Sequence, residues 1–409
     1  MKLHLSGPGQ NTLRANIRIT GSKSESNRAL LLAARYPNLA VENISNSDDA
    51  QVMQAGLGRT TGVVDIHHAG TAMRFLTGYF ASTPGAQVTL TGSQRMTERP
   101  IKVLVDALLQ LGADISYGQE EGYPPLIIKG RKLLKNRVHL PADISSQYIS
   151  SLLLMAPGLP QGLRLELEGE ITSVPYIEMT LGLLAEIGVP SQFKGNAITV
   201  HPKAAVPGKT LVVESDWSSA SYFYSLVALA EVGSEIVLSS YREKSLQGDR
   251  VLAEIYTHFG VQSSFVGHSL VLRKERPHST DSLNVNLIKA PDIAQTIAVT
   301  CFGLGMPCHL TGLHTLKIKE TDRLLALDAE LKKLGAPISV TRTSLTLSPA
   351  NGINRGVAID TYNDHRMAMA FAPLALKTEI VINDAGVVSK SYPDFWKDMQ
   401  ALQIAVKQL

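Results

Sequence analysis

The chain has 409 residues, of which 44% are hydrophobic and 18% are charged. These proportions are those of an ordinary globular protein, and the length favours two or three domains over one. The net charge is only +3 and the sequence contains no run of Lys or Arg, which argues against nucleic acid as a partner. Small anionic ligands fit this balance, because a few cations gathered in one cleft leave the total charge near zero.

No export signal is evident in residues 1–19, which contain neither an apolar run of signal-peptide length nor an Arg- and Ser-rich arm. The longest apolar stretches, 29–34 and 226–230, are much shorter than a membrane span, so we expect no membrane association. The two cysteines, Cys301 and Cys308, are too few for a disulfide framework, and this favours a reducing cytoplasm.

One pattern recurs six times along the chain: a small or polar residue that can cap a helix, followed by an apolar helix. The six segments are 24–34 (SESNRALLLAA), 70–81, 145–157, 218–230, 292–303 and 364–376. The last four begin about 73 residues apart, which is long enough for one α/β supersecondary unit. Because these helices are apolar nearly all round, we expect them to be buried at the centre of each domain, where their small residues allow close packing.

Each of these helices is followed by a short strand-like run, and a second, amphipathic helix comes next. The expected strands are 41–44, 87–91, 164–167, 235–238, 308–311 and 379–382, and the clearest second helices are 100–111, 175–187, 248–259 and 319–334. The repeated unit is therefore strand, helix, strand, helix and further strand. Six units divide most simply into two lobes of three; the alternative is a generic α/β protein with chance similarity between segments.

The residues suited to chemistry lie at the starts of these helices and in the loops before them. A helix N-terminus offers unpaired N–H groups and a positive dipole end, so several such termini combined with cations predict a phosphate or carboxylate site. An isolated Arg is usually a solvated surface charge, but Arg74 and Arg366 each adjoin a Met on an apolar helix face. A charge buried there needs an anionic partner. The cations in these positions are Lys23, Arg28, Arg74, Arg95, Arg99, Lys319, Arg323, Arg366 and Lys390.

Nine strings between residues 21 and 396 occur in a fixed order. They are GSKSESNRALLLAA, AGTAMRF, RMTERPI, SSQYISSLLL, SSASYF, PDIAQT, KIKETDRLLAL, YNDHRMAM and SKSYPDFW. In this order they resemble the motif set of the EPSP synthase family, the 3-phosphoshikimate 1-carboxyvinyltransferases. The strings KETDR and NDHRMAM carry most of the specificity, and the resemblance covers nearly the whole chain.

The resemblance implies an α/β fold of two inside-out lobes, each an α/β barrel of three βαβαββ units, in agreement with the six repeats. It implies chain crossings near Thr20 and Glu214, so that one lobe comprises 20–213 and the other 1–19 with 214–409, with the active site in the cleft between them. The implied reaction transfers the enolpyruvyl group of phosphoenolpyruvate (PEP) to the 5-hydroxyl of shikimate 3-phosphate, giving EPSP and phosphate. This is a step of the shikimate pathway of aromatic amino acid biosynthesis. We expect a monomer that needs no cofactor or metal and binds only these small substrates.

The resemblance also implies which residues contact each substrate. For shikimate 3-phosphate they are Lys23, Ser24, Arg28, Ser145, Ser146, Gln147, Ser173, Asp292, Thr315 and Lys319, with Tyr176 beside them. For PEP they are Lys23, His68, Gly70, Arg99, Gln147, Arg323, Arg366 and Lys390. The implied catalytic residues are Asp292, Glu320 and Lys23, with His365 next to them. Three positions depart from the common family pattern, His68, Phe75 and Thr315, although His and Thr can still form hydrogen bonds.

Two carboxylates are candidates for proton transfer, because the attacking hydroxyl must lose a proton and the methylene carbon of PEP must gain one. Asp292 opens an expected helix, where the dipole favours its ionised form as a base; the alternative is a plain N-cap. Glu320 lies between Lys319 and Arg323, and its alternative role is an ion pair with Arg323.

Other functions fit parts of the sequence. The related UDP-N-acetylglucosamine enolpyruvyl transferases usually carry a loop Cys as the acid, whereas the corresponding loop here, 93–96, reads SQRM. A non-catalytic anion-binding homologue would have no reason to retain Lys23, Asp292 and Glu320. Nucleotide and metal binding lack support, because no Walker-type or GxGxxG loop is present and His67 with His68 has no paired ligand at helical spacing.

Overall fold

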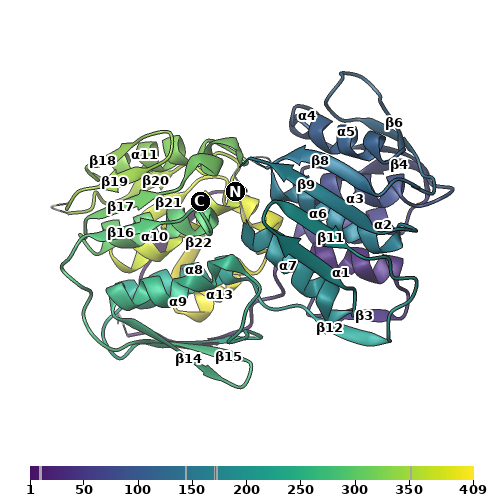
Figure 1. Ribbon diagram of the computed structural model, residues 1–409. Helices are drawn as coiled ribbons and strands as arrows, with labels where there is room; N and C mark the ends of the chain where they lie inside the picture. Colours follow the sequence, from purple (N-terminus) through teal and green to yellow (C-terminus); the bar gives the residue numbers. More distant parts are fainter. Residues whose placement is uncertain (9–11, 143–144, 170, 172–173, 351) are drawn as a thin grey trace. The chain divides into compact units, whose positions relative to one another are not determined.

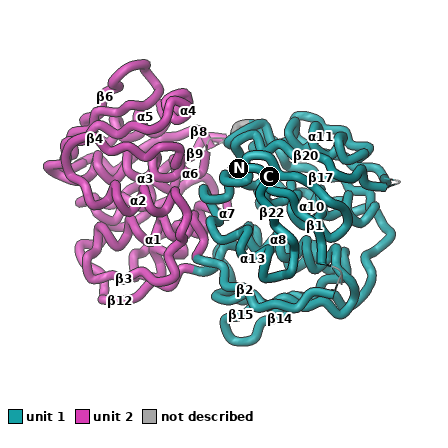
Figure 2. The backbone as a smooth tube through the Cα atoms, turned by 180° about the vertical axis from the view of Figure 1, so that it is seen from behind, with its two compact units in different colours: residues 1–20, 214–409 teal, residues 21–213 magenta. Residues whose placement is uncertain are grey.

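The computed structural model describes residues 1–8, 12–142, 145–169, 171, 174–350 and 352–409 (Figure 1). Over this part of the chain, the backbone divides into two compact units (Figure 2). Unit 1 comprises Met1–Thr20 and Glu214–Leu409, and unit 2 comprises Gly21–Val213. None of the described helices is both long enough and apolar enough to cross a membrane.

Unit 2 is built from helices and three sheets. Its helices are α1 (Lys23–Arg35), α2 (Asp48–Leu57), α3 (Gly70–Ala81), α4 (Gln94–Thr97), α5 (Lys102–Gln110), α6 (Ser146–Met155), the 3-10 helix η1 (Ala156–Gly158) and α7 (Val174–Glu186). Its strands are β3 (Leu39–Glu42), β4 (Thr61–Asp65), β5 (Gln87–Thr91), β6 (Asp114–Tyr117), β7 (Leu126–Lys129), β8 (Arg137–Pro141), β9 (Leu163–Glu168), β10 (Ser191–Lys194), β11 (Ala197–Val200) and β12 (Lys209–Val212).

Unit 1 likewise contains three sheets and includes both ends of the chain. Its strands are β1 (Leu3–Ser6), β2 (Arg14–Ile17), β13 (Glu235–Ser239), β14 (Val261–Val266), β15 (Ser269–Lys274), β16 (Leu283–Asn286), β17 (Cys308–Thr311), β18 (Ile338–Val340), β19 (Leu345–Leu347), β20 (Val357–Ile359), β21 (Ile380–Ile382) and β22 (Ala405–Gln408). Its α-helices are α8 (Trp217–Leu229), α9 (Leu252–Ile255), α10 (Ala294–Gly303), α11 (Arg323–Lys333), α12 (His365–Phe371) and α13 (Phe395–Ala401). Its 3-10 helices are η2 (Gly248–Val251), η3 (Tyr256–Phe259), η4 (Pro291–Ile293), η5 (His314–Ile318), η6 (Ala372–Leu376) and η7 (Ala385–Lys390).

The four-stranded sheets of the described chain, two in unit 2 and three in unit 1, share one topology. In the sheet β4-β5-β7-β6, the first two strands run parallel and the other two continue the sheet antiparallel. A parallel pair requires a crossover connection, and α3 supplies it between β4 and β5. In unit 1 the same arrangement uses both chain ends, because β1 joins β21 to β22 and β2 pairs parallel with β13.

The sixth sheet, β12-β3, has fewer strands than the sequence repeat predicts. Its parallel strands β3 and β12 are present, but α2 leads directly to β4 of the next sheet. Only residues 58–60 separate α2 from β4, which leaves no room for the two antiparallel strands that complete the other sheets. Within the described residues, the βαβαββ unit is therefore complete five times and truncated once.

Helices occupy the centre of each unit, and the sheets lie around them. Along α8 every residue is buried, and α3, α6 and α10 are almost completely buried, as their apolar sequences predict. The strands instead alternate buried and exposed residues, as β7 and β8 do, so each sheet has one face toward the helices. The expected burial of the first helix of each repeat is confirmed for these four.

Small side chains let the central helices approach closely. A Cβ on Gly78 of α3 would lie 2.5 Å from the hydroxyl of Ser151 on α6, which donates to the carbonyl of Arg74 at 2.7 Å. In unit 1, the hydroxyls of Ser221 and Thr296 lie 3.0 Å apart between α8 and α10. The sequence pattern of small residues thus becomes direct contact between helices.

Several expected elements have different bounds in the structure. The helix expected over 319–334 begins at Arg323, because Asp322 caps it by accepting from the Leu325 N–H at 3.2 Å. The segment expected as one helix over 248–259 is η2, α9 and η3. The strand expected over 41–44 is β3, two residues earlier, because Asn43 has a left-handed backbone with φ of 54°. The first difference places Lys319 and Glu320 in a loop.

We expect Gly78→Ala to lower the free energy of unfolding by about 1–3 kcal/mol, the usual cost of overpacking a core contact. The added methyl group would collide with Ser151, whose hydroxyl cannot move without losing its bond to Arg74. Gly58→Ala is the control, because a Cβ there would have its nearest neighbour at an ordinary 3.5 Å. Urea denaturation measures both, and equal stability of the two variants would contradict the close packing of α3 and α6.

Candidate active site

Arg323 is the centre of a buried ion cluster in unit 1. It is the first residue of α11, and its side chain is only 2% exposed. Its Nε donates to Asp364 at 2.7 Å and its Nη1 donates to Asp292 at 2.7 Å. Its Nη2 donates to Glu320 at 2.8 Å. Burial alone would lower the pKa of Arg323, but the three carboxylates raise it above its ordinary value, so the guanidinium stays charged.

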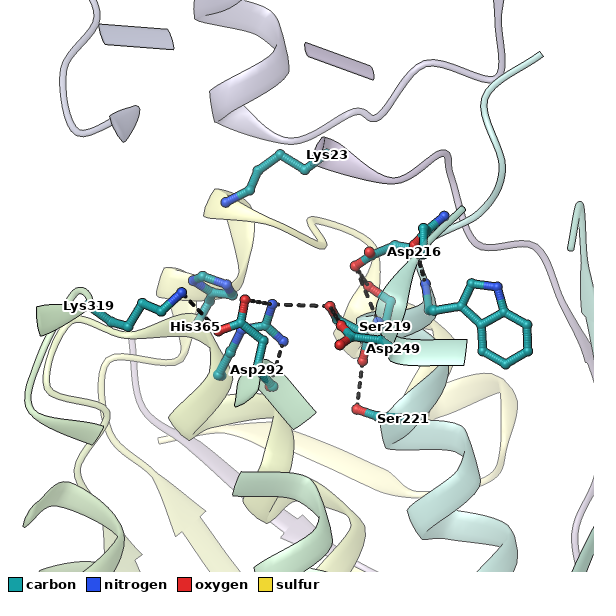
Figure 3. A network of polar contacts seen from close by, with 12 residues as sticks. Lys23, Asp216, Ser219, Ser221, Asp249, Asp292, Lys319 and His365 are labelled. Atoms are coloured by element: carbon teal, nitrogen blue, oxygen red, sulfur yellow. Dashed lines mark hydrogen bonds and ion pairs between the residues drawn. The ribbon is translucent and has the colours of Figure 1, made fainter. Parts of the chain in front are cut away.

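Asp292, in η4, contacts three cations. Besides Arg323, Lys319 Nζ lies 3.3 Å from its Oδ1 and Arg366 Nη2 lies 3.5 Å from its Oδ2. Figure 3 shows Lys319 pointing toward Asp292. Burial would raise the pKa of Asp292, but Lys319, Arg366 and Arg323 hold it well below its usual range. The carboxylate is therefore ionised, and the alternative that it is a plain N-cap is wrong, because it caps neither η4 nor α10.

Glu320 lies in the loop before α11, with 31% of its side chain exposed. Its ion pair with Arg323, at 2.8 Å, is the alternative that the sequence left open. The pair joins this loop to the first residue of α11. Its role in proton transfer stays a prediction.

Arg366, on α12, is held by groups that the sequence analysis missed. Its Nη1 donates to the carbonyl of Asp292 at 3.0 Å, and its Nη2 donates to Ser218 at 3.1 Å. Ser218 in turn donates to Asp249 at 2.6 Å. Burial would lower the pKa of Arg366, but Asp292 first, then Tyr222 and Asp249, raise it well above its ordinary value. The anionic partner expected for Arg366 is thus Asp292, and Asp249 is connected to Arg366 through Ser218.

Asp249 and Asp216 complete this network (Figure 3). Burial, followed by repulsion from Asp292, raises the pKa of Asp249 to about 6. Asp216 caps α8 by accepting from the N–H of Ser219 at 3.2 Å and from its hydroxyl at 2.8 Å. The position of Asp216 just before an apolar helix could have identified it from the sequence, whereas Asp249 follows a different strand and carries no such signal.

Lys390, at the end of η7, is bonded to the loop before α12. Its Nζ donates to the carbonyl of Asn363 at 2.8 Å and to the side-chain oxygen of the same residue at 2.6 Å. The next residue, Asp364, caps α12 by accepting from the Arg366 N–H at 2.9 Å. The string YNDHR therefore supplies partners for both Lys390 and Arg323. In this structure all three unit 1 residues expected to bind PEP are bonded to groups of the same unit.

Arg28, on α1, is buried in unit 2 with no carboxylate oxygen within 4 Å in the part of the chain that the structure describes. It donates to the hydroxyls of Thr180 at 2.8 Å and Ser150 at 2.9 Å, and to the carbonyl of Ser24 at 2.8 Å. Its guanidinium also lies 5.9 Å from the ring of Tyr176. Burial lowers the pKa of Arg28 to about 10. The structure brings Ser24, Arg28 and Tyr176 together, and Ser150 and Thr180 are additional partners that the sequence analysis missed.

Two helix starts in unit 2 carry expected PEP residues. Lys23 opens α1, with its Nζ 3.7 Å from the buried Asp49. Gly70 opens α3, and a Cβ there would lie 2.6 Å from Nη1 of Arg99. A residue with a Cβ at this position would displace the guanidinium that lies against it.

The start of α6 carries the serine motif. Ser145 caps the helix by accepting from the Gln147 N–H at 3.3 Å, and Ser146 is the first helical residue. The side-chain amide of Gln147 donates to Thr71 on α3 at 3.3 Å. The expected residues of α3 and α6 are therefore brought together within unit 2.

His68 lies just before α3, with its Nε2 3.8 Å from a carboxylate oxygen of Asp48. Asp48 and Asp49 are the first two residues of α2, where the helix dipole favours negative charge. Lys23 and His68, two residues expected to contact substrate, thus each have an acidic neighbour at the start of α2. The sequence analysis missed this pair of aspartates.

Arg74, on α3, differs from the expectation. Its guanidinium donates to the carbonyls of Gly70 at 3.3 Å and Pro100 at 3.1 Å and lies 5.9 Å from the ring of Tyr148. Burial, and then the nearby Arg99, lower the pKa of Arg74 to about 10. Within the part of the chain that the structure describes, backbone carbonyls and an aromatic ring take the place of the anionic partner that was expected for this charge.

The remaining expected residues are placed as follows. Arg95 is exposed and forms an ion pair with Glu98 at 3.0 Å. It is therefore a surface charge, which was the usual alternative for an Arg in the sequence analysis. The hydroxyl of Thr315 is buried and, among the described residues, has no hydrogen-bond partner. His365 is buried beside Asp364, its Nδ1 3.9 Å from a carboxylate oxygen. Ser173 lies outside the described residues.

Comparison with solved structures defines the class of this fold. The chain matches the enolpyruvyl transferase NikO from Streptomyces tendae with a TM-score of 0.73 at 14% identity, over 99% of this chain and 98% of that one. It matches an EPSP synthase from Acinetobacter baumannii with a TM-score of 0.82 at 21% identity, over all of both chains. The chain therefore has the fold of enolpyruvyl transferases.

Sequence comparison identifies the family. A family model described as EPSP synthase (3-phosphoshikimate 1-carboxyvinyltransferase) matches residues 38–399. A 3-phosphoshikimate 1-carboxyvinyltransferase of Bacteroides fragilis (strain YCH46) is 43% identical over 414 aligned positions, which cover 100% of this chain and 99% of the relative. The chain belongs to the EPSP synthase family, a family of transferases. The family and the α/β fold class expected from the motifs are confirmed.

We expect the free energy of unfolding of Asp249→Asn to rise relative to that of wild type as pH rises. The pKa of Asp249 is raised from an ordinary 3.8 to about 6 in the folded chain, so the folded state binds this proton more tightly than the unfolded state. The contribution of this proton to the free energy of unfolding is fully present below pH 3.8, the pKa of an ordinary Asp, and is lost as pH rises through 6. Because Asn has no such proton, the difference in unfolding free energy should shift toward the variant by about 2 kcal/mol between pH 4 and pH 8.

Urea denaturation across this pH range measures the shift. Asp328→Asn is the control, because Asp328 belongs to an i,i+4 ion pair with the exposed Lys332. A difference between Asp249→Asn and wild type that stays constant with pH would contradict the raised pKa.

Proposed function

We propose that the chain transfers the enolpyruvyl group of PEP to the 5-hydroxyl of shikimate 3-phosphate, giving EPSP and phosphate in the shikimate pathway. The observation that carries this proposal is the ionised Asp292 among Arg323, Arg366 and Lys319, in a chain of the EPSP synthase family. Attack of a hydroxyl on an anionic phosphate ester requires a base beside cations that neutralise the developing charge.

We keep the domains 20–213 and 1–19 with 214–409 as a proposal, which is supported by compact units that divide between Thr20 and Gly21 and between Val213 and Glu214. The proposed contacts of shikimate 3-phosphate are Lys23, Ser24, Arg28, Ser145, Ser146, Gln147 and Ser173 with Asp292, Thr315 and Lys319. Those of PEP are Lys23, His68, Gly70, Arg99 and Gln147 with Arg323, Arg366 and Lys390.

Substrate binding must replace some of the ion pairs within unit 1. Arg323 and Arg366 both contact Asp292, so a bond from either guanidinium to PEP weakens its hold on this carboxylate. The guanidinium fork binds phosphate and carboxylate groups in the same geometry, which makes the exchange feasible. As the cations turn to the substrate, the pKa of Asp292 rises and the carboxylate becomes a better base. The base is thus activated when both substrates are in place.

The proposed reaction has two stages with opposite proton transfers. In the addition, Asp292 accepts the proton of the 5-hydroxyl as its oxygen attacks the central carbon of PEP, and Glu320 donates a proton to the methylene carbon. In the elimination, Glu320 removes a proton from that methyl group and the double bond forms again. Asp292 returns its proton to the leaving phosphate, which restores both carboxyl groups to their starting states. Lys23 stabilises negative charge on the substrates between the two stages. We place the partly exposed Glu320 on the PEP side of the proposed site. We place the buried Asp292 beside the ring of shikimate 3-phosphate.

The transfer to UDP-N-acetylglucosamine is the nearest alternative reaction. It usually employs a loop cysteine, but the only cysteines of the sequence, Cys301 and Cys308, are buried in α10 and β17. Neither thiol can take the place of an exposed loop acid. This favours shikimate 3-phosphate as acceptor. The presence of Lys23, Asp292 and Glu320 argues against a chain that has kept the fold but lost catalysis.

We further propose that the chain works as a cytoplasmic monomer, without cofactor, and with the two substrates as its only partners. Both cysteines are free thiols, which a reducing compartment maintains. The small net charge of +3 offers no extended basic surface to nucleic acid.

We expect phosphate release only when PEP and shikimate 3-phosphate are both present, with no requirement for metal. Shikimate is the acceptor control, because it lacks the phosphate that the cations of unit 2 are expected to bind. A phosphate-release assay measures the reaction directly. Equal activity with UDP-N-acetylglucosamine in place of shikimate 3-phosphate would overturn the proposal.

The two carboxylates should not be equivalent. Asp292→Asn should lower turnover by about 100-fold or more, because it removes the base and leaves three cations without their common partner. Glu320→Gln should reduce turnover while leaving shikimate 3-phosphate binding unchanged, since Glu320 belongs to the PEP side. Steady-state kinetics and calorimetry measure the two effects, with Asp328→Asn as control. Near-full turnover of Glu320→Gln would show that Glu320 serves only as an ion-pair partner of Arg323.

A further inference from the structure

The turn between β20 and α12 has an unfavourable backbone conformation. Two successive residues, Tyr362 and Asn363, have left-handed φ angles of 52° and 57°. Asn tolerates this conformation, but a bulky residue such as Tyr adopts it rarely and at an energetic cost. Tertiary contacts must therefore hold the turn in place.

Helix α11 supplies these contacts through Glu330, a carboxylate with no exposed surface. Its Oε1 accepts from the hydroxyl of Tyr362 at 2.6 Å, and its Oε2 accepts from the backbone N–H of Asp360 at 3.1 Å. Lys333 donates to Glu330 at 2.8 Å and to the side chain of Asp360 at 2.7 Å. Two turns earlier on the same helix, Arg323 binds Asp364. Side chains of α11 thus form hydrogen bonds to both ends of the turn, at Asp360 and Asp364, and to its middle, at Tyr362.

The conformation of the turn determines where its polar atoms lie. Asn363 presents both its carbonyl and its side-chain oxygen to Lys390 Nζ, at 2.8 and 2.6 Å. Both acceptors belong to a residue in the left-handed region, so a change at Tyr362 or Asn363 would redirect them. Lys390 is therefore positioned by a turn that is itself held by Glu330.

We propose that Glu330 and Tyr362 are positioning residues for Lys390, acting through Asn363. The inference rests on the proposed function, in which Lys390 binds PEP, and extends it to two side chains that contact neither substrate. Through the turn, the interior of α11 is connected to the PEP side of the site. Loss of the Tyr362–Glu330 bond should impair PEP binding more than binding of shikimate 3-phosphate.

The first experiment compares Tyr362→Phe with Tyr224→Phe. Both remove a tyrosine hydroxyl in unit 1 that makes a short hydrogen bond, since Tyr224 bonds to Ser263 at 2.7 Å, away from the proposed site. Tyr362→Phe should raise KM for PEP about tenfold, the loss expected for one hydrogen bond to a charged group, with KM for shikimate 3-phosphate unchanged. Tyr224→Phe should change neither constant. Equal effects of both variants on the two KM values, whatever their melting temperatures, would overturn the proposal.

The second experiment separates backbone conformation from side-chain packing. Tyr362 is 40% exposed, so its removal leaves no large core cavity. Tyr362→Ala and Tyr362→Gly lose the same hydroxyl, but only Gly adopts a positive φ without strain. KM for PEP should therefore be about fivefold lower for Tyr362→Gly than for Tyr362→Ala. Equal values for the two variants would show that the left-handed turn does not determine PEP binding.

Hydrogen exchange of residues 361–366 and 385–391 gives a readout that does not depend on turnover. Exchange there should be faster in Tyr362→Phe than in Tyr224→Phe, and equal exchange would overturn the role of Glu330 in holding the turn. If wild type released no phosphate from PEP and shikimate 3-phosphate, the proposed function would fail and the assignment to PEP with it. The exchange rates would still decide whether the turn and Lys390 depend on Tyr362.

Discussion

The arrangement of unit 1 depends on one buried guanidinium, that of Arg323, which joins carboxylates from three separate segments. Asp292 precedes α10, Glu320 lies in the loop before α11, and Asp364 caps α12. Removing one partner of a buried ion pair leaves an uncompensated charge and costs about 3–5 kcal/mol. The starts of three elements are therefore fixed relative to one side chain, and the turn that carries Asn363 follows from the position of Asp364.

The same cluster separates the pKa values of neighbouring carboxylates. Asp292 contacts three cations, and its pKa is held well below the usual range even though it is buried. Asp249 is connected to Arg366 by hydrogen bonds through Ser218, and burial together with the charge of Asp292 raises its pKa to about 6. One carboxylate of the network thus stays ionised, while the charge of the other changes near neutral pH. Environments that separate titratable groups in this way are typical of catalytic sites.

The sequence predicted those parts of the structure that depend on local pattern. Helix α3 and strands β5 and β17 have the expected bounds, because apolar periodicity and turn residues determine them. Contacts between distant segments were less accessible. Arg74 was expected to need an anion, but carbonyls of Gly70 and Pro100 bind it, and no local pattern shows where those carbonyls point. Asp249 was missed for the same reason, since its importance comes from Ser218, on another helix of the same repeat, and from Arg366, which belongs to a different repeat.

The two units hold their buried guanidinium groups in different ways, and the difference bears on how anions bind. In unit 2 the guanidinium groups of Arg28 and Arg74 are bonded to hydroxyls and carbonyls, and burial lowers the pKa of each to about 10. In unit 1 Arg323 and Arg366 are bonded to carboxylates, which raise their pKa values. An anion approaching a guanidinium bonded only to neutral groups gains its full attraction, whereas beside Arg323 it must compete with Asp292, Glu320 and Asp364. For the proposed function, unit 2 thus offers guanidinium groups that could anchor an anion, and unit 1 offers ion pairs that could exchange with one. In the proposed mechanism, this exchange releases both candidates for proton transfer, Asp292 and Glu320, so substrate binding would also activate the base.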